Sequence, residues 1–335
     1  MPLLAIGDRA PRSVTPQLAV VVDTEEEFDW AAPFSRGNRS TRNIAAQALA
    51  HEILDPLGVV PTYVIDYPVA TDPGAVAFLQ GLQRDGRAEI GAHLHPWVSP
   101  PHEEEVNRRN SYHGNLPPEL ERAKIVRLTD EVARSFGRPA VFKAGRYGFG
   151  PNTAGVIADL GYEVDCSFVP WTSFAEDGGP DYQDTPDQPF WLDRARGLLE
   201  VPLTSGFFGR LGRAGPCLQR LFNDRGARRL RVPGMLARSG LVTRSRLTPE
   251  GVPAAEQCRL LDAMVATGRS FFTLTYHSPS LGVGNTPYVR SEAELSAFLR
   301  TIDRVLRHFR DELGGEFTTL TRHRRSMLAA AAVPA

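Results

Sequence analysis

The sequence predicts an α/β fold built on a parallel sheet of about seven strands with helices outside. Short, near-continuous apolar runs alternate with helical segments along the chain. A strand that is apolar throughout is typical of a sheet that is covered on both faces, as parallel sheets are. Seven strands suit an incomplete or distorted barrel as well as a doubly wound open sheet, so this pattern allows both.

The strands are expected at 17–23, 59–66, 88–96, 140–145, 164–169, 197–204 and 270–277. Helices are expected at 41–58, 72–86, 117–137, 152–162 and 291–309. Gly58 and Gly137 end two of these helical segments, and Pro73 stands in the first turn of another. No internal repeat is visible.

The domain organisation follows from where this alternation starts and stops. Residues 1–16 are expected to be an N-terminal lead-in, 17–325 a single catalytic domain, and 326–335 a flexible tail. Residues 205–250 interrupt the alternation and contain ten arginines against two acids, which indicates a basic insertion. It could be a solvated charged face, or it could contact an anionic membrane surface or a lipid-linked glycan.

Composition excludes several classes of function. The 335-residue chain has a formal net charge of −1, so no general attraction to nucleic acid is expected. There is no run of 18 apolar residues to span a membrane, and the first residues lack the basic segment of an export signal. Three cysteines without motif spacing fit a reducing compartment. We therefore expect a cytoplasmic protein, and the sequence leaves its oligomeric state open.

Polar residues gather where the predicted strands end. Asp23 and Glu25 follow the first strand, His93 and His95 the third, and His277 the last. Residues two apart on a strand point to the same side, and active sites of α/β folds lie at the C-terminal ends of the strands. Two imidazoles and a carboxylate suit a divalent metal, zinc by default, and leave a second carboxylate free as a base.

Each of these residues also has an ordinary structural explanation. Asp23 could cap a helix, His93 could be satisfied inside the core, and His95 could belong to a turn. None of these roles explains why the residues gather at one end of one sheet, so their convergence favours a functional site. The neighbouring acids Glu26 and Asp29 are expected to face solvent or to stabilise the loop.

Five segments occur in an order that characterises one enzyme family. They are VVDTEE (21–26), EIGAHLHPW (89–97), FKAGRYGFG (142–150), GYEVDCSFVP (161–170) and LTYHSPS (274–280). Through them the sequence resembles the polysaccharide deacetylases, the family of chitin-deacetylase-like catalytic domains. The resemblance implies a distorted, incomplete β/α barrel, a divalent metal, and hydrolytic removal of acetyl groups from N-acetylated sugars.

The resemblance also implies roles for individual residues. Asp23 matches the family's general base, and Glu25 and His93 match metal ligands. His277 matches the general acid, and Asp165 matches an aspartate that orients the catalytic groups together with a basic partner.

The sequence departs from the family pattern at the metal site. Thr24 separates two acids that are adjacent in the usual family motif. Trp97 stands where the second metal histidine is usual, four residues after the first. His95 is the nearest substitute, and His102 and His113 in the following loop are rivals.

A third departure concerns the basic partner. Lys143 stands at the position of the family's arginine, and Arg146 lies three residues further on. Either could pair with Asp23 or Asp165, and we prefer Arg146 because lysine does not reproduce the bidentate pairing of arginine.

We therefore expect a metal-dependent hydrolase that acts on an N-acetylated saccharide. A backbone amide near Tyr147 could stabilise the oxyanion, and Tyr147, Trp97 and Trp171 could stack on sugar rings. Two alternatives remain open: a metal-free amide hydrolase of the same fold, and a catalytically inactive saccharide-binding protein. A metal-dependent phosphatase or nuclease is disfavoured because the sequence shows no second carboxylate-rich cluster.

Overall fold

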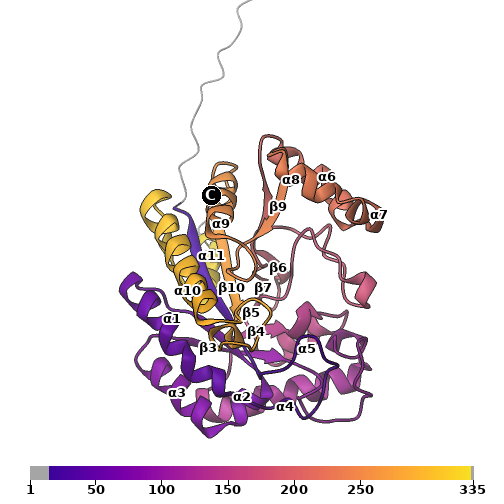
Figure 1. The fold of residues 1–335 in the computed structure, drawn as a ribbon. Helices are drawn as coiled ribbons and strands as arrows, with labels where there is room; N and C mark the ends of the chain where they lie inside the picture. Colours follow the sequence, from indigo (N-terminus) through magenta and orange to yellow (C-terminus); the bar gives the residue numbers. More distant parts are fainter. Residues whose placement is uncertain (1–14, 333–335) are drawn as a thin grey trace, which may run out of the picture.

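The computed structural model describes residues 15–332, and a curled sheet that stays open along one side lies at its centre (Figure 1). The strands are β1 (Gln17–Thr24), β2 (Thr62–Ile65), β3 (Glu89–Leu94), β4 (Val141–Ala144), β5 (Val164–Asp165), β6 (Phe190–Asp193), β7 (Leu198–Glu200), β8 (Ser205–Phe208), β9 (Thr243–Arg246), β10 (Phe271–His277) and β11 (Glu316–Phe317). In the main sheet they follow the order β10-β1-β2-β3-β4-β5-β7-β6, with β11 paired to β1.

All strand pairs from β10 to β7 are parallel, and β6 at the edge is antiparallel to β7. Figure 1 shows indigo β1 and orange β10, which come from near the two ends of the chain, lying side by side. Each of the seven predicted strands is present, and the predicted distorted, incomplete β/α barrel is confirmed. β6, β8, β9 and β11 were not predicted.

The helices between residues 15 and 332 are α1 (Gln47–Leu54), α2 (Tyr67–Thr71), α3 (Pro73–Arg84), α4 (Pro118–Phe136), α5 (Thr153–Asp159), α6 (Gly215–Asn223), α7 (Arg225–Arg229), α8 (Val232–Arg238), α9 (Ala254–Val265), α10 (Glu292–Arg307) and α11 (Leu320–Ala332). Every predicted helix is found.

α11 continues to residue 332, so most of the stretch predicted as a flexible tail is helical, while 333–335 lie outside the described residues. The predicted lead-in, 1–16, also lies almost wholly outside them. Across the described part of the chain, none of these helices combines the length and apolarity that crossing a bilayer demands.

Alternate residues of β1 enter two different cores, because successive side chains of a strand point to opposite faces. Leu18, Val20 and Val22 pack in the large core beneath the outer helices. Ala19 and Val21 belong to a smaller core inside the curl of the sheet. α11 contributes Leu320 to that inner core, so the inner core is closed near the start of β1 and the opposite end is left for a site.

Two irregular segments bridge the open side of the sheet between β7 and β10. The amide of Thr273 donates to Thr204 Oγ1 at 2.7 Å. The amide of Leu247 donates to the Thr204 carbonyl at 2.9 Å, and the amide of Thr275 donates to the Leu247 carbonyl at 3.1 Å. The chain that follows β9 is therefore held against β10 at the rim of the barrel.

Lys124 on α4 holds the segment that follows β3. Its ammonium group is buried, donates to the carbonyls of Pro96, Ser99 and Pro101 at 2.7–3.0 Å, and lies 2.9 Å from a carboxylate oxygen of Glu104. A buried cation is tolerated only when such partners replace its hydration. The loop that leaves the C-terminal end of β3 is thereby tied to an outer helix.

Replacement of this cation tests its role in stability. Lys124→Met is expected to lower the free energy of unfolding by about 3–5 kcal/mol, because it leaves Glu104 and three carbonyls buried without a donor. Arg122→Met, which removes an exposed ion pair from the same helix, is the matched control and should lower it by about 1 kcal/mol or less. Urea unfolding of both variants measures the difference, and equal effects would contradict the role of Lys124.

Candidate active site

The acidic run after β1 turns into a cavity at the C-terminal end of the sheet. The cavity has a volume of about 470 Å³, and both Asp23 and Glu25 line it. They continue the inward series of Ala19 and Val21, as the predicted spacing of two requires. Both carboxylates are buried.

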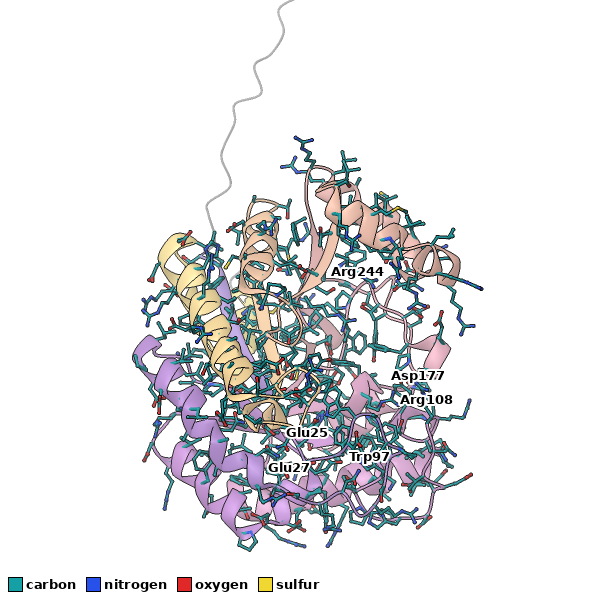
Figure 2. The ribbon with its side chains drawn as sticks, in the orientation of Figure 1. Glu25, Glu27, Trp97, Arg108, Asp177 and Arg244 are labelled. Atoms are coloured by element: carbon teal, nitrogen blue, oxygen red, sulfur yellow. The ribbon has the colours of Figure 1, made fainter. Side chains whose placement is uncertain are left out.

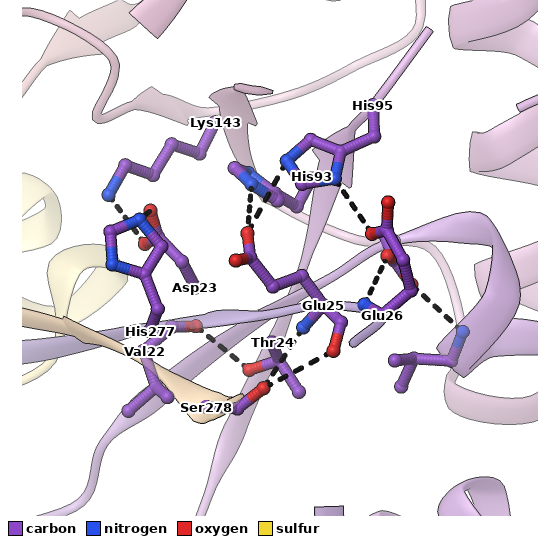
Figure 3. A network of polar contacts seen from close by, with 12 residues as sticks. Val22, Asp23, Thr24, Glu25, Glu26, His93, His95, Lys143, His277 and Ser278 are labelled. Atoms are coloured by element: carbon purple, nitrogen blue, oxygen red, sulfur yellow. Dashed lines mark hydrogen bonds and ion pairs between the residues drawn. The ribbon is translucent and has the colours of Figure 1, made fainter. Parts of the chain in front are cut away.

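Three predicted histidines line the same cavity. His93 comes from β3, His95 follows it, and His277 ends β10. The register places His277 opposite Asp23 on the neighbouring strand. The structure therefore brings five predicted residues together, from β1, β3 and β10 (Figure 3).

The side chains of Glu25, His93 and His95 bring three potential metal-ligand atoms close together. Glu25 Oε2 lies 3.3 Å from His95 Nε2 and 3.5 Å from His93 Nε2. Burial lowers the pKa of both imidazoles, which favours the neutral form that binds metals. Ligands held at about 2.1 Å by a tetrahedral metal lie about 3.4 Å apart, so the spacing fits a divalent cation.

Unsatisfied atoms support the same interpretation. Glu25 Oε1 and His93 Nδ1 are buried and have no hydrogen-bond partner among the described residues. Buried polar atoms normally have a partner, so an unpaired carboxylate oxygen beside two imidazoles fits a site for a cation. These three residues form a cluster that can hold a metal ion.

Glu26 orients the second of these histidines. Its Oε2 lies 2.8 Å from His95 Nδ1, and its Oε1 accepts from Trp97 Nε1 at 2.7 Å. Glu26 is buried, so the expectation that it faces solvent is wrong. Its bond to Trp97 agrees with the alternative, a role in stabilising a loop. Trp97, at the position where a second metal histidine was sought, instead holds the carboxylate behind His95, and burial raises the pKa of Glu26 to about 8.

The rival histidines do not enter the metal cluster. His102 is exposed on the loop after β3. His113 is buried elsewhere, with its Nδ1 3.0 Å from Glu121 Oε1 on α4. Among the alternatives weighed from the sequence, the structure thus places His95 beside Glu25 and His93.

Lys143 is the basic partner of Asp23. Its Nζ donates to Asp23 Oδ1 at 2.5 Å, and the side chain reaches Asp23 from β4, where Lys143 is opposite His93 in the register. Burial alone would raise the pKa of Asp23, but Lys143, His277 and His93 outweigh it and hold the pKa at about 2. Asp23 is therefore ionised at neutral pH.

The preference for Arg146 as this partner is wrong. Arg146 lines the cavity, but its guanidinium binds Asp177 and Ser111 and lies 4.2 Å from the Tyr112 ring centroid. Asp177 also pairs with Arg108, and the two lie apart from Glu25 in Figure 2. Arg146 has a positive φ of 53°, which turns it from the line of β4 toward this second acid.

Asp165 does not orient the catalytic groups as predicted. Its register partner on β4 is Phe142, which points into the outer core, whereas the next residue, Lys143, points to Asp23 on the inner side of the sheet. Asp165 accepts from Ser167 Oγ at 2.7 Å and lies beside Glu200 on the outer side of the sheet. Because successive side chains of a strand point to opposite faces, Asp165 points away from the site, and a shift of one residue would have pointed it inward.

Glu250 takes the orienting role that was expected of Asp165, and sequence reasoning missed it. Its Oε2 lies 2.7 Å from His277 Nδ1, and its Oε1 accepts from the His277 amide and from Ser280 Oγ. Burial would lower the pKa of His277, but Glu250, Glu25 and Asp23 raise it well above its usual value. The available signal was that Glu250 is one of two acids in an arginine-rich segment.

Aromatic side chains form part of the cavity wall. Phe28, Trp30, Tyr147 and Tyr288 line it, and the Trp30 ring meets His277 edge-on with centroids 5.1 Å apart. Tyr147 is therefore placed as its predicted stacking role requires. Trp97 is buried behind the metal cluster, and Trp171 lines a separate cavity near β8.

Comparisons with known proteins identify the fold. Among solved structures, the chain is similar to one from Mycobacterium smegmatis provisionally described as a polysaccharide deacetylase, with a TM-score of 0.56 and 16% identity over 97% of this chain and 94% of that one. It also matches 4-alpha-glucanotransferase from Thermococcus litoralis, with a TM-score of 0.50 and 12% identity, over 93% of this chain and 40% of that chain. The chitin deacetylase of Colletotrichum lindemuthianum matches with a TM-score of 0.44 and 11% identity, over 92% and 88%.

No family model and no curated protein sequence matches the chain. The chain nevertheless shares its fold, over nearly its whole length, with a protein described as a polysaccharide deacetylase, so the resemblance seen in its motifs is supported at the level of the fold.

The contact between Glu26 and His95 makes a testable prediction. Glu26→Gln is expected to weaken binding of a divalent metal roughly 10–100-fold, because carboxylates behind a ligating histidine set its orientation and basicity. Glu27→Gln is the matched control, since the neighbouring Glu27 bonds Ser40 and lies outside the metal cluster. Competition with a metal-binding dye measures both affinities, and equal losses would contradict the role of Glu26.

Proposed function

We propose that the protein is a divalent-metal-dependent hydrolase that removes acetyl groups from N-acetylated sugars of a glycan or glycan precursor. One observation carries this proposal: the carboxylate of Asp23, paired with Lys143, and the imidazole of His277, paired with Glu250, face the same cavity beside a Glu–His–His cluster. The fold shared with a protein described as a polysaccharide deacetylase supports it.

Glu25, His93 and His95 would hold the metal, and zinc suits a set of two imidazoles and one carboxylate. Such a cation supplies Lewis-acid polarisation of a carbonyl and lowers the pKa of water. In deacetylation, water adds to the acetyl carbon, the C–N bond breaks, and the products are acetate and a free amine.

Asp23 accepts the proton of the attacking water. Lys143 engages Oδ1, and Oδ2 lies 3.6 Å from His277 Nε2 at the cavity surface, so Oδ2 is the oxygen available to a substrate water. A fixed carboxylate acts as general base when it stays ionised and lies within hydrogen-bond reach of the proton. Lys143 keeps it ionised.

His277 protonates the leaving nitrogen. Glu250 holds Nδ1, so the Nε2 proton points toward the cavity. The leaving nitrogen is too basic to depart as an anion, so donation of this proton allows the C–N bond to break and the free amine to leave. Trp30 and Tyr288 flank the cavity here, and their apolar faces suit a sugar ring.

Acetate release tests the proposed reaction. Wild-type protein supplied with one divalent metal per chain is expected to release acetate from N-acetylated oligosaccharides. Asp23→Asn should lower kcat about 10²-fold or more and retain metal, because the amide still accepts from Lys143 but cannot take a proton. His93→Ala should lose both metal and activity.

Enzymatic acetate assay and metal analysis of the purified proteins give both readouts. Saccharide binding without acetate release by the metal-loaded wild type would favour an inactive binding protein instead. Acetate release by a fully demetallated wild type would favour a metal-free amide hydrolase.

The pH profile tests the pairing of His277 with Glu250. The acid form of His277 is required, so kcat should fall as pH rises through its pKa, which Glu250, Glu25 and Asp23 raise. Glu250→Gln removes one of these negative charges, so the alkaline limb is expected to move to lower pH. Glu256→Gln, which breaks a contact with Ser245 away from His277, should leave the limb unchanged.

A further inference from the structure

The segment between β8 and β9 forms a lobe that the proposed reaction does not use. It contains α6, α7 and α8 and stands out from the sheet at the upper right of Figure 1. β8 and β9 pair with each other in a separate two-stranded sheet. Eight arginines of this lobe are exposed: Arg210, Arg213, Arg220, Arg225, Arg228, Arg229, Arg231 and Arg238.

One side of the lobe is neutralised by the rest of the molecule. Arg225 and Arg228 pair with Glu176, and Arg220 pairs with Asp184, both on the acidic loop that follows β5. These contacts fasten α6 and α7 to the body of the protein. The remaining five exposed arginines have no ion-pair partner among the described residues.

The unpaired arginines surround exposed aliphatic side chains. Leu211, Leu230 and Met235 are 53%, 72% and 56% exposed, and they are half of the strongly exposed large hydrophobic residues between positions 15 and 332. In sequence, unpaired arginines flank each of them: Arg210 and Arg213, Arg229 and Arg231, and Arg231 and Arg238. We call these three aliphatic residues and five arginines the α8 surface.

The backbone brings these aliphatic residues to one helix. Leu230 lies two residues before the first residue of α8, and Met235 lies within it. The amide of Leu211 donates to the carbonyl of Leu241, just beyond the C-terminal end of α8. All three aliphatic residues therefore lie on or beside one short helix that contains no buried residue.

We propose that the α8 surface docks the protein on an anionic lipid bilayer. Aliphatic side chains among arginines suit the boundary between acyl chains and anionic headgroups, where both kinds of group are satisfied. A purely polyanionic partner would engage the arginines but gives no reason to expose Leu230 and Met235. A second copy of this surface would bring five unpaired arginines against five others, which opposes self-association.

Vesicle binding of the full-length protein tests the proposal, and needs no saccharide substrate. The protein is expected to co-sediment with vesicles of phosphatidylcholine and phosphatidylglycerol, and not with phosphatidylcholine alone. Raising the salt concentration from about 0.05 M to 0.5 M should weaken binding, because it screens the headgroup charge. Failure to bind the mixed vesicles at low salt would overturn the proposal.

Two variants separate the charged and apolar parts of the α8 surface. The double variant Leu230→Ser with Met235→Ser, and the triple variant Arg229→Ser with Arg231→Ser and Arg238→Ser, should each weaken vesicle binding about tenfold or more. All of these residues are exposed, and circular dichroism checks that the variants fold. Loss in the arginine variant alone would show that binding rests on charge without the aliphatic residues, as for any polyanion, and would overturn the bilayer assignment.

A matched control lies on α11. Leu328 is 39% exposed and stands near the exposed Arg322 and Arg325, so Leu328→Ser with Arg322→Ser and Arg325→Ser removes the same kinds of group elsewhere. This control should bind vesicles like the wild type. Equal losses in the control and the α8 variants would show a nonspecific charge effect and overturn the proposal.

Discussion

The site depends on the buried ion pair between Lys143 and Asp23. Burial raises the pKa of an isolated carboxyl group, as it does for Glu25, to about 7, and for Glu26, to about 8. Asp23 lies in the same buried run, yet Lys143 and two histidines hold its pKa at about 2. Adjacent acids thus acquire different pKa values, because burial dominates at Glu25 and Glu26, whereas Lys143 and the two histidines together outweigh it at Asp23.

Strand parity decides which residues can join this pair. The sheet is parallel from β10 to β7, so a side chain reaches the cavity only from alternate positions of each strand. Lys143 has the inward parity, whereas Asp165 has the outward parity and meets Glu200 behind the sheet. The order of motifs along the chain does not show which side chains point inward, because a residue at a strand end can face either side of the sheet.

The sequence was sufficient for the fold and for most of the inner cluster. Apolar runs located the seven strands, and spacing by two placed Asp23 beside Glu25 and His93 beside His95. These local patterns do not predict contacts between site residues and segments that are distant in the sequence. Glu250 reaches His277 only because the chain after β9 is hydrogen-bonded along β10, which no local pattern reveals.

The same hydrogen bonds along β10 connect the arginine-rich lobe to the cavity. The strand that returns from the lobe, β9, leads through Leu247 to Glu250, and Arg246 and Thr248 line the catalytic cavity on the way. The lobe's other anchor is the acidic loop, in which Asp177 pairs with Arg146 at the cavity. A segment that interrupts the sequence pattern like a dispensable insertion thus supplies Glu250, the partner of His277.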